Sequence, residues 1–451
     1  MEPTSTKSTR VALAGAGVLL VWSVVRAATQ SVTPGEAWNY DRYIGCEWRE
    51  ALSGFDSNNH VLNTILVRIS TARIHLTELS MRLPSLLFGG LYLWVVYRLA
   101  RRCFGSGPLF LAVFGLMSLN PLMMDAMSEA RGYGMALTCW LWALHLILES
   151  FESLSASKLN RAGVLLGLSV AASLAFAAPV LALILVALAF ERKRLSYLPH
   201  LAFLTAFLFL AVPLNHAEKA LVTSGATSLR QTLNELTQES FGTSNRFFGA
   251  IARAATGLLA LAGLVTAFVT WRRRKQGTAA LLAGIVGGSL AVSLLLVLAA
   301  HRWAHAAFPE SGAIYVVAMI TLLVPAIIAS SGGASAQKAF LVVAAFCIAH
   351  HIGHVRLSYL GAQNLEGGRD LAKALRADAA GRTVRVSATE EAEGILRYYR
   401  ARLRQGNWNP IERLLPDATY DYYVVTAPYA TMVKERGLHI VYRDEGLILA
   451  K

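Results

Sequence analysis

The feature that most constrains this chain is a series of apolar stretches, each long enough to cross a lipid bilayer, that recur between Val11 and Val355. A bilayer core is roughly 30 Å thick and needs about 20 helical residues to span it, and lipid offers no partner for unpaired backbone groups. Runs such as residues 281–300 are therefore expected to be transmembrane helices. The composition, with 55% hydrophobic and 16% charged residues, departs from that of a soluble domain in the same direction. The sequence predicts a polytopic α-helical membrane protein.

We expect about eleven transmembrane helices. They are placed at residues 10–27, 79–98, 107–124, 130–148, 161–177, 179–191, 197–215, 249–270, 278–300, 312–330 and 338–355. Pro179 divides one long apolar run, residues 162–190, which is either a helical hairpin or one kinked helix. The basic clusters distinguish these alternatives, since short cytoplasmic loops are rich in Lys and Arg. Only the hairpin puts every cluster on the cytoplasmic side, namely 98–102, 158–161, 192–194 and 272–275.

The formal net charge of +14 could suggest nucleic acid, but the basic residues sit in short clusters beside apolar runs. We therefore expect no nucleic-acid partner. The four cysteines have no repeated spacing, which argues against a disulfide framework or a cysteine metal site. No ATP-binding glycine loop appears, so nothing in the sequence indicates ATP-driven transport.

After residue 355 the pattern changes from membrane spans to short alternating elements. Residues 383–388 and 422–426 resemble strands, and residues 390–405 form an amphipathic pattern between them. The sequence thus predicts two domains: a transmembrane domain over 1–355, with a first external loop at 28–77, and a small α/β domain over 356–451. With eleven spans, the loop and the C-terminal domain both lie on the extracytoplasmic side.

The first external loop contains two acids that could act as a general base, Glu36 and Asp41. Glu36 has a structural alternative, because Thr33-Pro34-Gly35-Glu36 matches a capping box at a helix start. On one helix Asp41 would point roughly 140° away from Glu36, so we do not expect the two acids to form a dyad.

Other candidate residues also have two interpretations. The segment Asn58-Asn59-His60 either caps the next helix or presents His60 to a substrate. Arg131 is either an interfacial anchor or a phosphate ligand, for which a guanidinium is well shaped. Glu310, before a later span, is interpreted as a charge favoured by the helix dipole. No cofactor is predicted, although the pairs His301 with His305 and His350 with His354 leave a divalent metal as an alternative.

Several motifs in the first half of the chain occur in a familiar order. They are Gly35-Glu36-Ala37 with Tyr40, then Asn59-His60, Glu78-Leu79-Ser80-Met81-Arg82-Leu83-Pro84-Ser85, Tyr97-Arg98-Leu99-Ala100-Arg101-Arg102-Cys103-Phe104-Gly105, and Ser128-Glu129-Ala130-Arg131-Gly132-Tyr133. This order resembles the GT-C membrane glycosyltransferases, in particular relatives of protein O-mannosyltransferases and lipid A aminoarabinose transferases. The motifs cover roughly residues 10–215, and beyond them the resemblance depends on the layout of the spans.

The resemblance implies that a sugar is taken from a polyprenyl-phosphate carrier outside the cytoplasm and passed to an acceptor with inversion. In the family, the Asp of an Asp-Glu pair in the first external loop is the expected base. Here that pair reads Gly35-Glu36, so the Asp is missing. Either Glu36 or Asp41 acts as the base, or the chain has lost the reaction. The later His-Pro-Pro of the family appears as His60-Val61-Leu62.

The sequence thus predicts a membrane glycosyltransferase of the cell envelope, in a bacterial inner (plasma) membrane, whose acceptor is a lipid, a glycan or a protein. Glu36 and Asp41 are the candidate catalytic acids, and Arg131, or else Arg82 or Arg302, would hold the departing phosphate. The remaining candidate substrate contacts are Tyr40, Asn59, His60, Glu129 and Tyr133. The alternatives are a lipid or polysaccharide transporter or flippase, in which the same charges bind a headgroup, and a non-catalytic assembly subunit with this fold.

Overall fold

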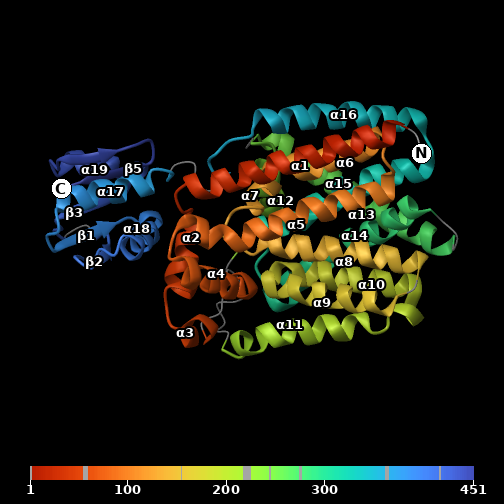
Figure 1. Cartoon of the computed structure of the whole chain (residues 1–451), viewed down its shortest axis with the longest axis horizontal. Coiled ribbons are helices and arrows are strands. Elements are labelled where there is room, and N and C mark those ends of the chain that lie inside the picture. Colours follow the sequence, from red (N-terminus) through yellow and green to blue (C-terminus); the bar gives the residue numbers. More distant parts are fainter. Residues whose placement is uncertain are drawn as a thin grey trace.

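The computed structural model describes residues 3–53, 59–153, 155–216, 225–242, 245–273, 277–360, 365–415 and 418–451. Asn58, proposed above as a helix cap, and residues 274–275 of one basic cluster lie outside these ranges. Long helices run side by side along the longest axis of the molecule, and the C-terminal domain lies beyond one end of them (Figure 1).

Nine helices in the described ranges are long and apolar enough to cross a membrane. They occur in α1 (Pro3–Thr29), α5 (Glu78–Phe104), α8 (Tyr133–Glu152), α10 (Ala177–Leu195), α11 (Leu198–Asn215), α13 (Arg246–Arg272), α14 (Thr278–Ala304), α15 (Ile314–Ser331) and α16 (Ala334–Gly353). The two other predicted spans correspond to α9 (Ala156–Ala172) and to a broken segment. That segment is α6 (Pro108–Leu119) followed by α7 (Pro121–Ala126), because Asn120 ends one helix and its side chain caps the next.

Residues 162–190 form the hairpin that the basic clusters favour. Ala172, at the end of α9, lies beside His60 of the first loop, whereas Phe190 of α10 lies with Phe151 at the other end of the bundle. The break is a 3-10 turn, Leu174–Phe176, so Pro179 lies in the first turn of α10 and does not itself divide the run. Proline is well tolerated there because the first helical N–H groups have no intrahelical partner.

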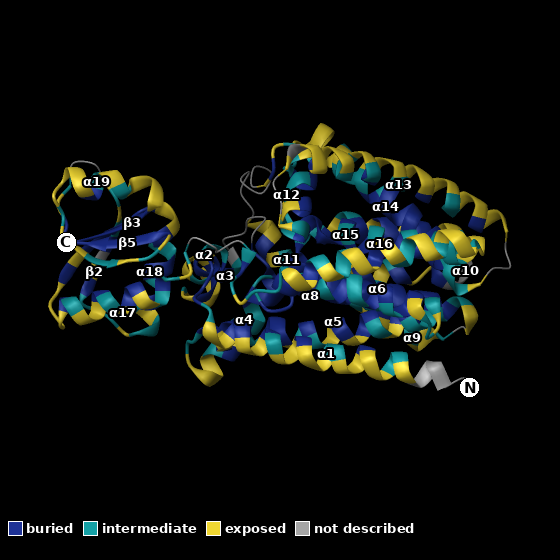
Figure 2. Ribbon diagram, turned by 90° about the horizontal axis from the view of Figure 1, so that it is seen from above, coloured by how far each residue is buried: buried dark blue, intermediate teal, exposed yellow. Residues whose placement is uncertain are grey.

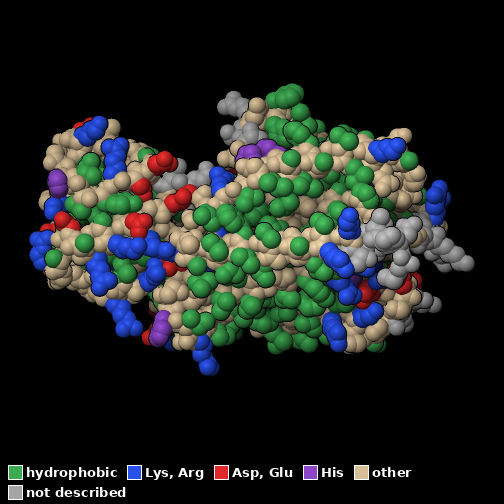
Figure 3. Space-filling view, turned by 45° about the horizontal axis from the view of Figure 1, so that its top comes forward, with side chains coloured by type: hydrophobic (Ala, Val, Ile, Leu, Met, Phe, Trp, Pro, Cys, Tyr) green, Lys and Arg blue, Asp and Glu red, His purple; other side chains and the backbone are tan. Residues whose placement is uncertain are grey.

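The central helices of the bundle are buried, and the outer helices expose apolar side chains, as expected for a bundle in lipid. The central helix α8 is largely buried, whereas α13 and α16 expose most of their apolar side chains (Figure 2). Exposed hydrophobic side chains cover the sides of the bundle, and Lys and Arg side chains gather near its ends (Figure 3). In water such a surface would be unfavourable, so lipid is its natural solvent.

Basic residues meet acids at the end of the bundle far from the C-terminal domain. Arg102 pairs with Glu152 at 2.6 Å, and Lys158 pairs with Glu149 at 3.0 Å. A cavity at the same end is lined by Glu152, Arg192 and Arg273. The predicted cytoplasmic clusters therefore share one end of the molecule.

The C-terminal domain begins at α17 (Gly368–Ala379) and contains a five-stranded sheet in the order β2-β1-β3-β5-β4. Its other elements are β1 (Val384–Ala388), α18 (Glu390–Arg402), β2 (Trp408–Arg413), β3 (Tyr422–Thr426), α19 (Ala430–Glu435), β4 (Ile440–Arg443) and β5 (Leu447–Ala450). Strand β1 pairs in parallel with β2 and β3, and β5 is antiparallel to β3 and β4. Helices α17 and α18 cover one face of the sheet and α19 the other (Figure 2). The predicted strands and amphipathic helix are present in this α/β fold.

The first loop lies between the bundle and this domain. It contains α2 (Pro34–Asn39), the π-helix η1 (Tyr40–Ile44), α3 (Trp48–Ser53) and α4 (Val61–Ile74), so the single helix considered for residues 34–52 is interrupted. Buried Glu78, at the start of α5, accepts hydrogen bonds from Arg369, Tyr399 and Arg402 of the C-terminal domain. These bonds join the loop end of the bundle to the domain.

Candidate functional site

Glu36 is a buried structural carboxylate. The capping box is present: the Glu36 amide donates to Thr33 Oγ1 at 3.2 Å, and the Thr33 amide donates to Glu36 Oε2 at 2.9 Å. Arg82 donates to both carboxylate oxygens, from Nε at 2.8 Å and from Nη2 at 2.6 Å. The Ala130 amide donates to Oε1 at 2.7 Å. Each oxygen of Glu36 thus accepts two hydrogen bonds, and the side chain has no exposed surface.

This environment argues against two of the predicted roles, Glu36 as the general base and Arg82 as a phosphate ligand. Burial alone would raise the pKa of Glu36, but the charge and hydrogen bonds of Arg82, with the two amides, outweigh it and lower the pKa. A carboxylate whose pKa is lowered and whose oxygens already accept two hydrogen bonds each is a poor proton acceptor, and so a poor general base. Arg82 is equally committed, since it also donates to the carbonyls of Ala27, Gln30 and Ser31, so it is not available to a phosphate.

Asp41 and Tyr40 face the C-terminal domain and not Arg131. Asp41 Oδ2 lies 3.0 Å from Arg397 Nη1, and the Tyr40 ring packs edge-on against Tyr398 at 5.2 Å. Both residues line a cleft described below. The prediction that Asp41 substitutes for the missing acid of the family is therefore not supported by its position, because the loop turns it away from the cation it would serve.

Asn59 and His60 are buried and support the loop from within. The Asn59 amide donates to the Ala51 carbonyl at 3.2 Å and its carbonyl oxygen accepts from Thr64 at 3.1 Å. His60 Nδ1 lies 3.1 Å from the Ala172 carbonyl oxygen, and the ring packs edge-on against Tyr133 at 4.6 Å. Burial, together with the charge of Arg131, lowers the pKa of His60 to about 3, so the ring is neutral near pH 7. In this structure these residues support Tyr133 and the hairpin turn, and their role as direct substrate contacts stays a prediction.

Arg131 and Tyr133 lie together at the junction between the first loop and α8. Arg131 Nη2 donates to the Tyr133 hydroxyl at 3.2 Å, and the guanidinium carbon lies 4.8 Å from the centre of the tyrosine ring. Gly132 between them passes very close to the hairpin turn, since a Cβ there would come within 1.9 Å of the Ala172 carbonyl oxygen. Only glycine allows this approach.

The guanidinium of Arg131 also lies against Gly35. A Cβ on Gly35 would lie 3.4 Å from the guanidinium carbon, which is ordinary van der Waals contact. The position where the resembled family carries its Asp is therefore directly beside Arg131. With glycine there, the guanidinium lines a small cavity of about 160 Å³ together with Gly35, Trp38 and Asn39.

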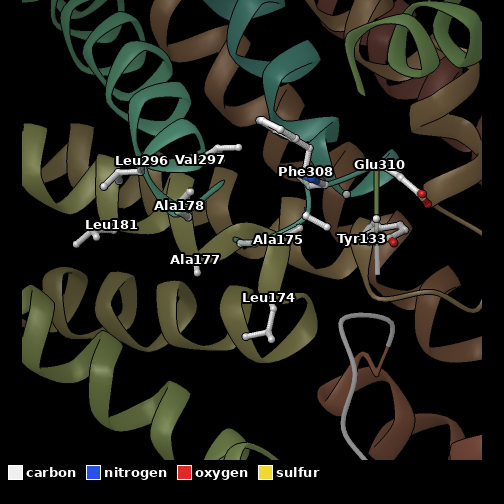
Figure 4. A pocket seen from close by; sticks show the side chains of 16 residues that line it. Tyr133, Leu174, Ala175, Ala177, Ala178, Leu181, Leu296, Val297, Phe308 and Glu310 are labelled. Atoms are coloured by element: carbon white, nitrogen blue, oxygen red, sulfur yellow. The ribbon is translucent and has the colours of Figure 1, made fainter. Parts of the chain in front are cut away.

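Tyr133 opens onto a second, larger cavity of about 410 Å³. Its walls are mostly apolar and come from α10, α14 and the segment before α15, including Leu181, Leu296 and Phe308. Tyr133 and Glu310 are the polar side chains at one end, with the aliphatic residues extending away from them (Figure 4). A cavity with a polar end and an apolar body suits an amphipathic ligand.

Against the effect of burial, the charges of three carboxylates, Glu129, Glu239 and Glu310, favour the protonated form of Arg131 and raise its pKa. Glu129 accepts a hydrogen bond from Thr33 Oγ1 at 2.8 Å, and burial raises its pKa. Burial also raises the pKa of Glu310, which lines the large cavity, and the nearby Glu235 adds to this shift. Arg131 is thus the centre of an acidic cluster drawn from three separate segments.

Glu239 belongs to α12 (Leu229–Phe241) and was not predicted as a site residue. One of its oxygens accepts a hydrogen bond from Ser311 at 2.9 Å, while the other is buried and has no hydrogen-bond partner among the described residues. Burial raises its pKa to about 7. Nothing in the sequence marks Glu239, apart from its place on an amphipathic segment of an external loop. Glu310 was interpreted only as a dipole charge, although it lies at the polar end of the large cavity.

Arg302 is exposed in the last turn of α14, whereas Leu296 and Val297 on the same helix line the cavity. The prediction that Arg302 contacts the phosphate therefore has no geometric support. Within the described ranges, no group of three or more His, Cys, Asp or Glu residues is arranged to hold a metal ion. His350 and His354 instead contact the Phe241 carbonyl and the His350 carbonyl.

Comparisons with known proteins find one matching family model and several solved structures with a similar fold. A family model described as dolichyl-phosphate-mannose-protein mannosyltransferase matches residues 62–216. ArnT from Cupriavidus metallidurans in the apo state aligns over 96% of both chains at 15% identity with a TM-score of 0.51, and ArnT bound to undecaprenyl phosphate gives the same values. AglB from Archaeoglobus fulgidus aligns over 94% of this chain and 70% of its own at 13% identity, with a TM-score of 0.45.

No curated protein sequence gives a significant match to the chain. At 15% identity, the likeness to ArnT shows a shared fold. The family model adds a sequence match over the segment that carries α4, α5, α8 and the loop of Arg131. The prediction of a polytopic helical membrane protein with a C-terminal α/β domain is confirmed, and both comparisons agree with the resemblance to GT-C glycosyltransferases. Over residues 62–216 the chain is similar to the dolichyl-phosphate-mannose-protein mannosyltransferases, and over nearly its whole length it has the fold of ArnT.

Proposed function

We propose that this protein transfers a sugar from a polyprenyl-phosphate donor to a hydroxyl of a lipid, glycan or protein acceptor, with inversion, on the extracytoplasmic face of a bacterial inner membrane. The observation that carries the proposal is the contact between Arg131 and Tyr133, because it joins the small polar cavity to the apolar one. The ArnT structure with undecaprenyl phosphate shows that this fold can accept such a lipid.

The two ends of the large cavity suit the two ends of the donor. The prenyl chain would occupy the apolar cavity, where burial of hydrocarbon is favourable by about 25 cal/mol per Å². The phosphate would lie at the polar end, within reach of Arg131 and the Tyr133 hydroxyl. As the sugar leaves, negative charge increases on the phosphate oxygen, and a preorganised guanidinium stabilises that charge.

We propose Glu310 as the general base in place of Glu36 and Asp41. The acceptor oxygen attacks the anomeric carbon while the bond from that carbon to the phosphate oxygen breaks. The electron pair of the broken bond stays on the phosphate, and the acceptor proton passes to the Glu310 carboxylate. Direct displacement inverts the anomeric configuration. Glu310 lines the cavity beside Tyr133 and has a raised pKa, as suits a base near neutral pH.

The distribution of basic residues indicates which side of the membrane the site faces. The basic clusters meet at the end of the bundle far from the first loop and the C-terminal domain. Because cytoplasmic loops carry the excess of Lys and Arg, the Arg131 end would face the extracytoplasmic side. The compact chain and its short loops favour a bacterial membrane.

The test is sugar transfer by the purified full chain in nanodiscs, with labelled polyprenyl-phosphate sugars and a membrane extract as acceptor. Glu310→Gln is expected to lower kcat by about 10²–10⁴-fold, the usual contribution of a general base. Glu47→Gln removes an exposed acid from the first loop and is the matched control. Full activity of Glu310→Gln with loss in Glu239→Gln would move the base to Glu239.

The position of Gly35 permits a rescue experiment. If Glu310 has replaced the Asp of the family, adding Gly35→Asp to Glu310→Gln should restore part of the lost transfer, since a side chain fits beside Arg131. Donor binding without transfer by the wild-type chain would favour the non-catalytic subunit. Movement of labelled lipid between leaflets without sugar transfer would favour the flippase.

A further inference from the structure

A second polar cleft lies on the other side of the segment that carries Gly35. It has a volume of about 680 Å³ and is formed by η1 of the first loop and by the C-terminal end of α18 with the turn that follows. Tyr40 and Asp41 line it from the loop, and Arg397, Arg400 and Arg404 line it from the C-terminal domain. Figure 3 shows Lys and Arg side chains gathered on the C-terminal domain near its junction with the bundle.

The three arginines of the cleft differ in how their charges are used. Arg397 is neutralised, because it pairs with Asp41 at 3.0 Å and with Glu393 at 2.6 Å. Arg400 and Arg404 have no acidic partner within the described part of the chain. The cleft therefore keeps two guanidinium groups whose charge is not balanced locally.

Arg404 has a backbone conformation that normally favours glycine. Its φ angle is +52°, at the point where the Gln405 amide donates back to the Arg400 carbonyl at 2.9 Å and ends the helix. Glycine is the usual residue at such a left-handed helix end, so an arginine there gives up some backbone stability. The turn places Arg404 on the same cleft as Arg400, one turn farther along the chain.

We propose that this cleft binds an oxyanion, a phosphate or a carboxylate, that is carried by the acceptor. A guanidinium fork matches either group with two parallel hydrogen bonds. Tyr40 and Arg400 would frame the group, and Asp41 holds Arg397 out of the way as part of the wall. Assignment of the oxyanion to the acceptor depends on the proposed transfer reaction, but the binding site itself does not.

The cleft lies next to the cavity of Arg131 along the first loop. Gly35, Trp38 and Asn39 line that cavity, and Tyr40 and Asp41, which follow directly in the chain, line the cleft. An acceptor bound in the cleft would thus carry its negative group on the loop side of the cavity of Arg131.

The first experiment measures binding of inorganic pyrophosphate to the full chain in nanodiscs of zwitterionic lipid, by calorimetry. We expect saturable binding that weakens at least tenfold in Arg400→Ala/Arg404→Ala. The control, Arg376→Ala/Arg443→Ala, removes the same charge from exposed positions elsewhere on the domain and should bind as the wild type does. Equal weakening in both double variants would show diffuse attraction and overturn the proposal, as would unchanged binding in the cleft variant.

Further measurements distinguish a bilayer headgroup from a group of the acceptor as the source of the oxyanion. They also distinguish failure of this proposal from failure of the proposed transfer reaction. Anionic lipid added to the nanodiscs weakens pyrophosphate binding only if a bilayer headgroup occupies the cleft, and unchanged binding points to a group above the membrane. Arg131→Ala should slow transfer strongly yet keep pyrophosphate binding at the cleft. In the transfer assay, pyrophosphate should compete with the acceptor extract and not with the donor lipid; competition with the donor would overturn the assignment to the acceptor.

Discussion

Two arginines that lie close to the same short helix differ in every respect that matters for chemistry. Arg82 has no exposed surface, and its donors are used by Glu36 and by three backbone carbonyls. Arg131 contacts a tyrosine hydroxyl, lines a cavity, and faces carboxylates whose hydrogen-bonding capacity is only partly used. The comparison teaches that a buried charge with saturated hydrogen bonds holds a fold together, whereas a charge with spare capacity beside a cavity can act on a ligand.

The largest effect on stability is expected from breaking the buried ion pair of Glu36 and Arg82. Glu36→Gln leaves the Arg82 charge buried without its counter-ion, which typically costs about 3–5 kcal/mol of unfolding free energy. Thermal unfolding in detergent would measure the loss. Glu36→Gln/Arg82→Met removes both charges and should recover much of it. The lowered pKa of Glu36 means that this stabilisation is present above its normal pKa and is lost as pH falls through the folded value. A melting temperature unchanged in Glu36→Gln would contradict the structural role.

Replacement of Arg131 should affect turnover strongly and stability little. Arg131→Ala removes a donor to the developing phosphate charge, and kcat should fall by about 10²–10³-fold. Because a cavity already adjoins Arg131, the melting temperature should change far less than in Glu36→Gln. Steady-state sugar transfer and thermal unfolding on the same preparations test both parts. If Arg131→Ala lost much stability and kept normal turnover, Arg131 would have a structural role like that of Arg82, and this prediction would be wrong.

The acids beside Arg131 predict the pH dependence of transfer. Burial raises the pKa of Glu310, and a general base acts only when ionised. The rate should therefore fall as pH decreases through that raised pKa, by about tenfold per pH unit below it. A pH–rate profile measures this limb, and Glu310→Gln should flatten it. An unaltered acid limb in that variant would assign the titration to another group, with Glu239 next in order.

The smallest effect is expected at the exposed pair of Asp41 and Arg397. Their side chains are 41% and 40% exposed, and such pairs typically contribute about 1 kcal/mol or less. Asp41→Asn should shift the unfolding temperature only slightly, as a thermal melt in detergent would show. A loss as large as that of Glu36→Gln would mean that the first loop and the C-terminal domain are coupled more tightly than this contact indicates.

Features that depend on neighbours along the chain could be predicted well. The apolar runs became helices, the capping box at Thr33 formed, and the hairpin over 162–190 followed from the placement of basic clusters. The pairing of Arg131 with Tyr133 was also within reach, because the two residues are adjacent in one motif. These signals are local, as are the hydropathy, capping and charge patterns behind them.

Features that depend on distant segments could not be predicted. Glu36 meets Arg82, which lies 46 positions away, and Ala130, which lies 94 positions away. Without these contacts the same acid is an equally good cap and base candidate. Glu310 and Glu239 approach Arg131 from segments with no motif of their own.

By itself, the sequence determined that this protein spans a membrane many times, carries a small α/β domain and resembles the GT-C glycosyltransferases, because hydrophobic length, strand periodicity and motif order are properties of the chain. Only the tertiary structure decided which carboxylate is free. Hydrogen-bonding capacity is shared among whichever groups folding brings together, so the role of an acid depends on the partners it meets in space.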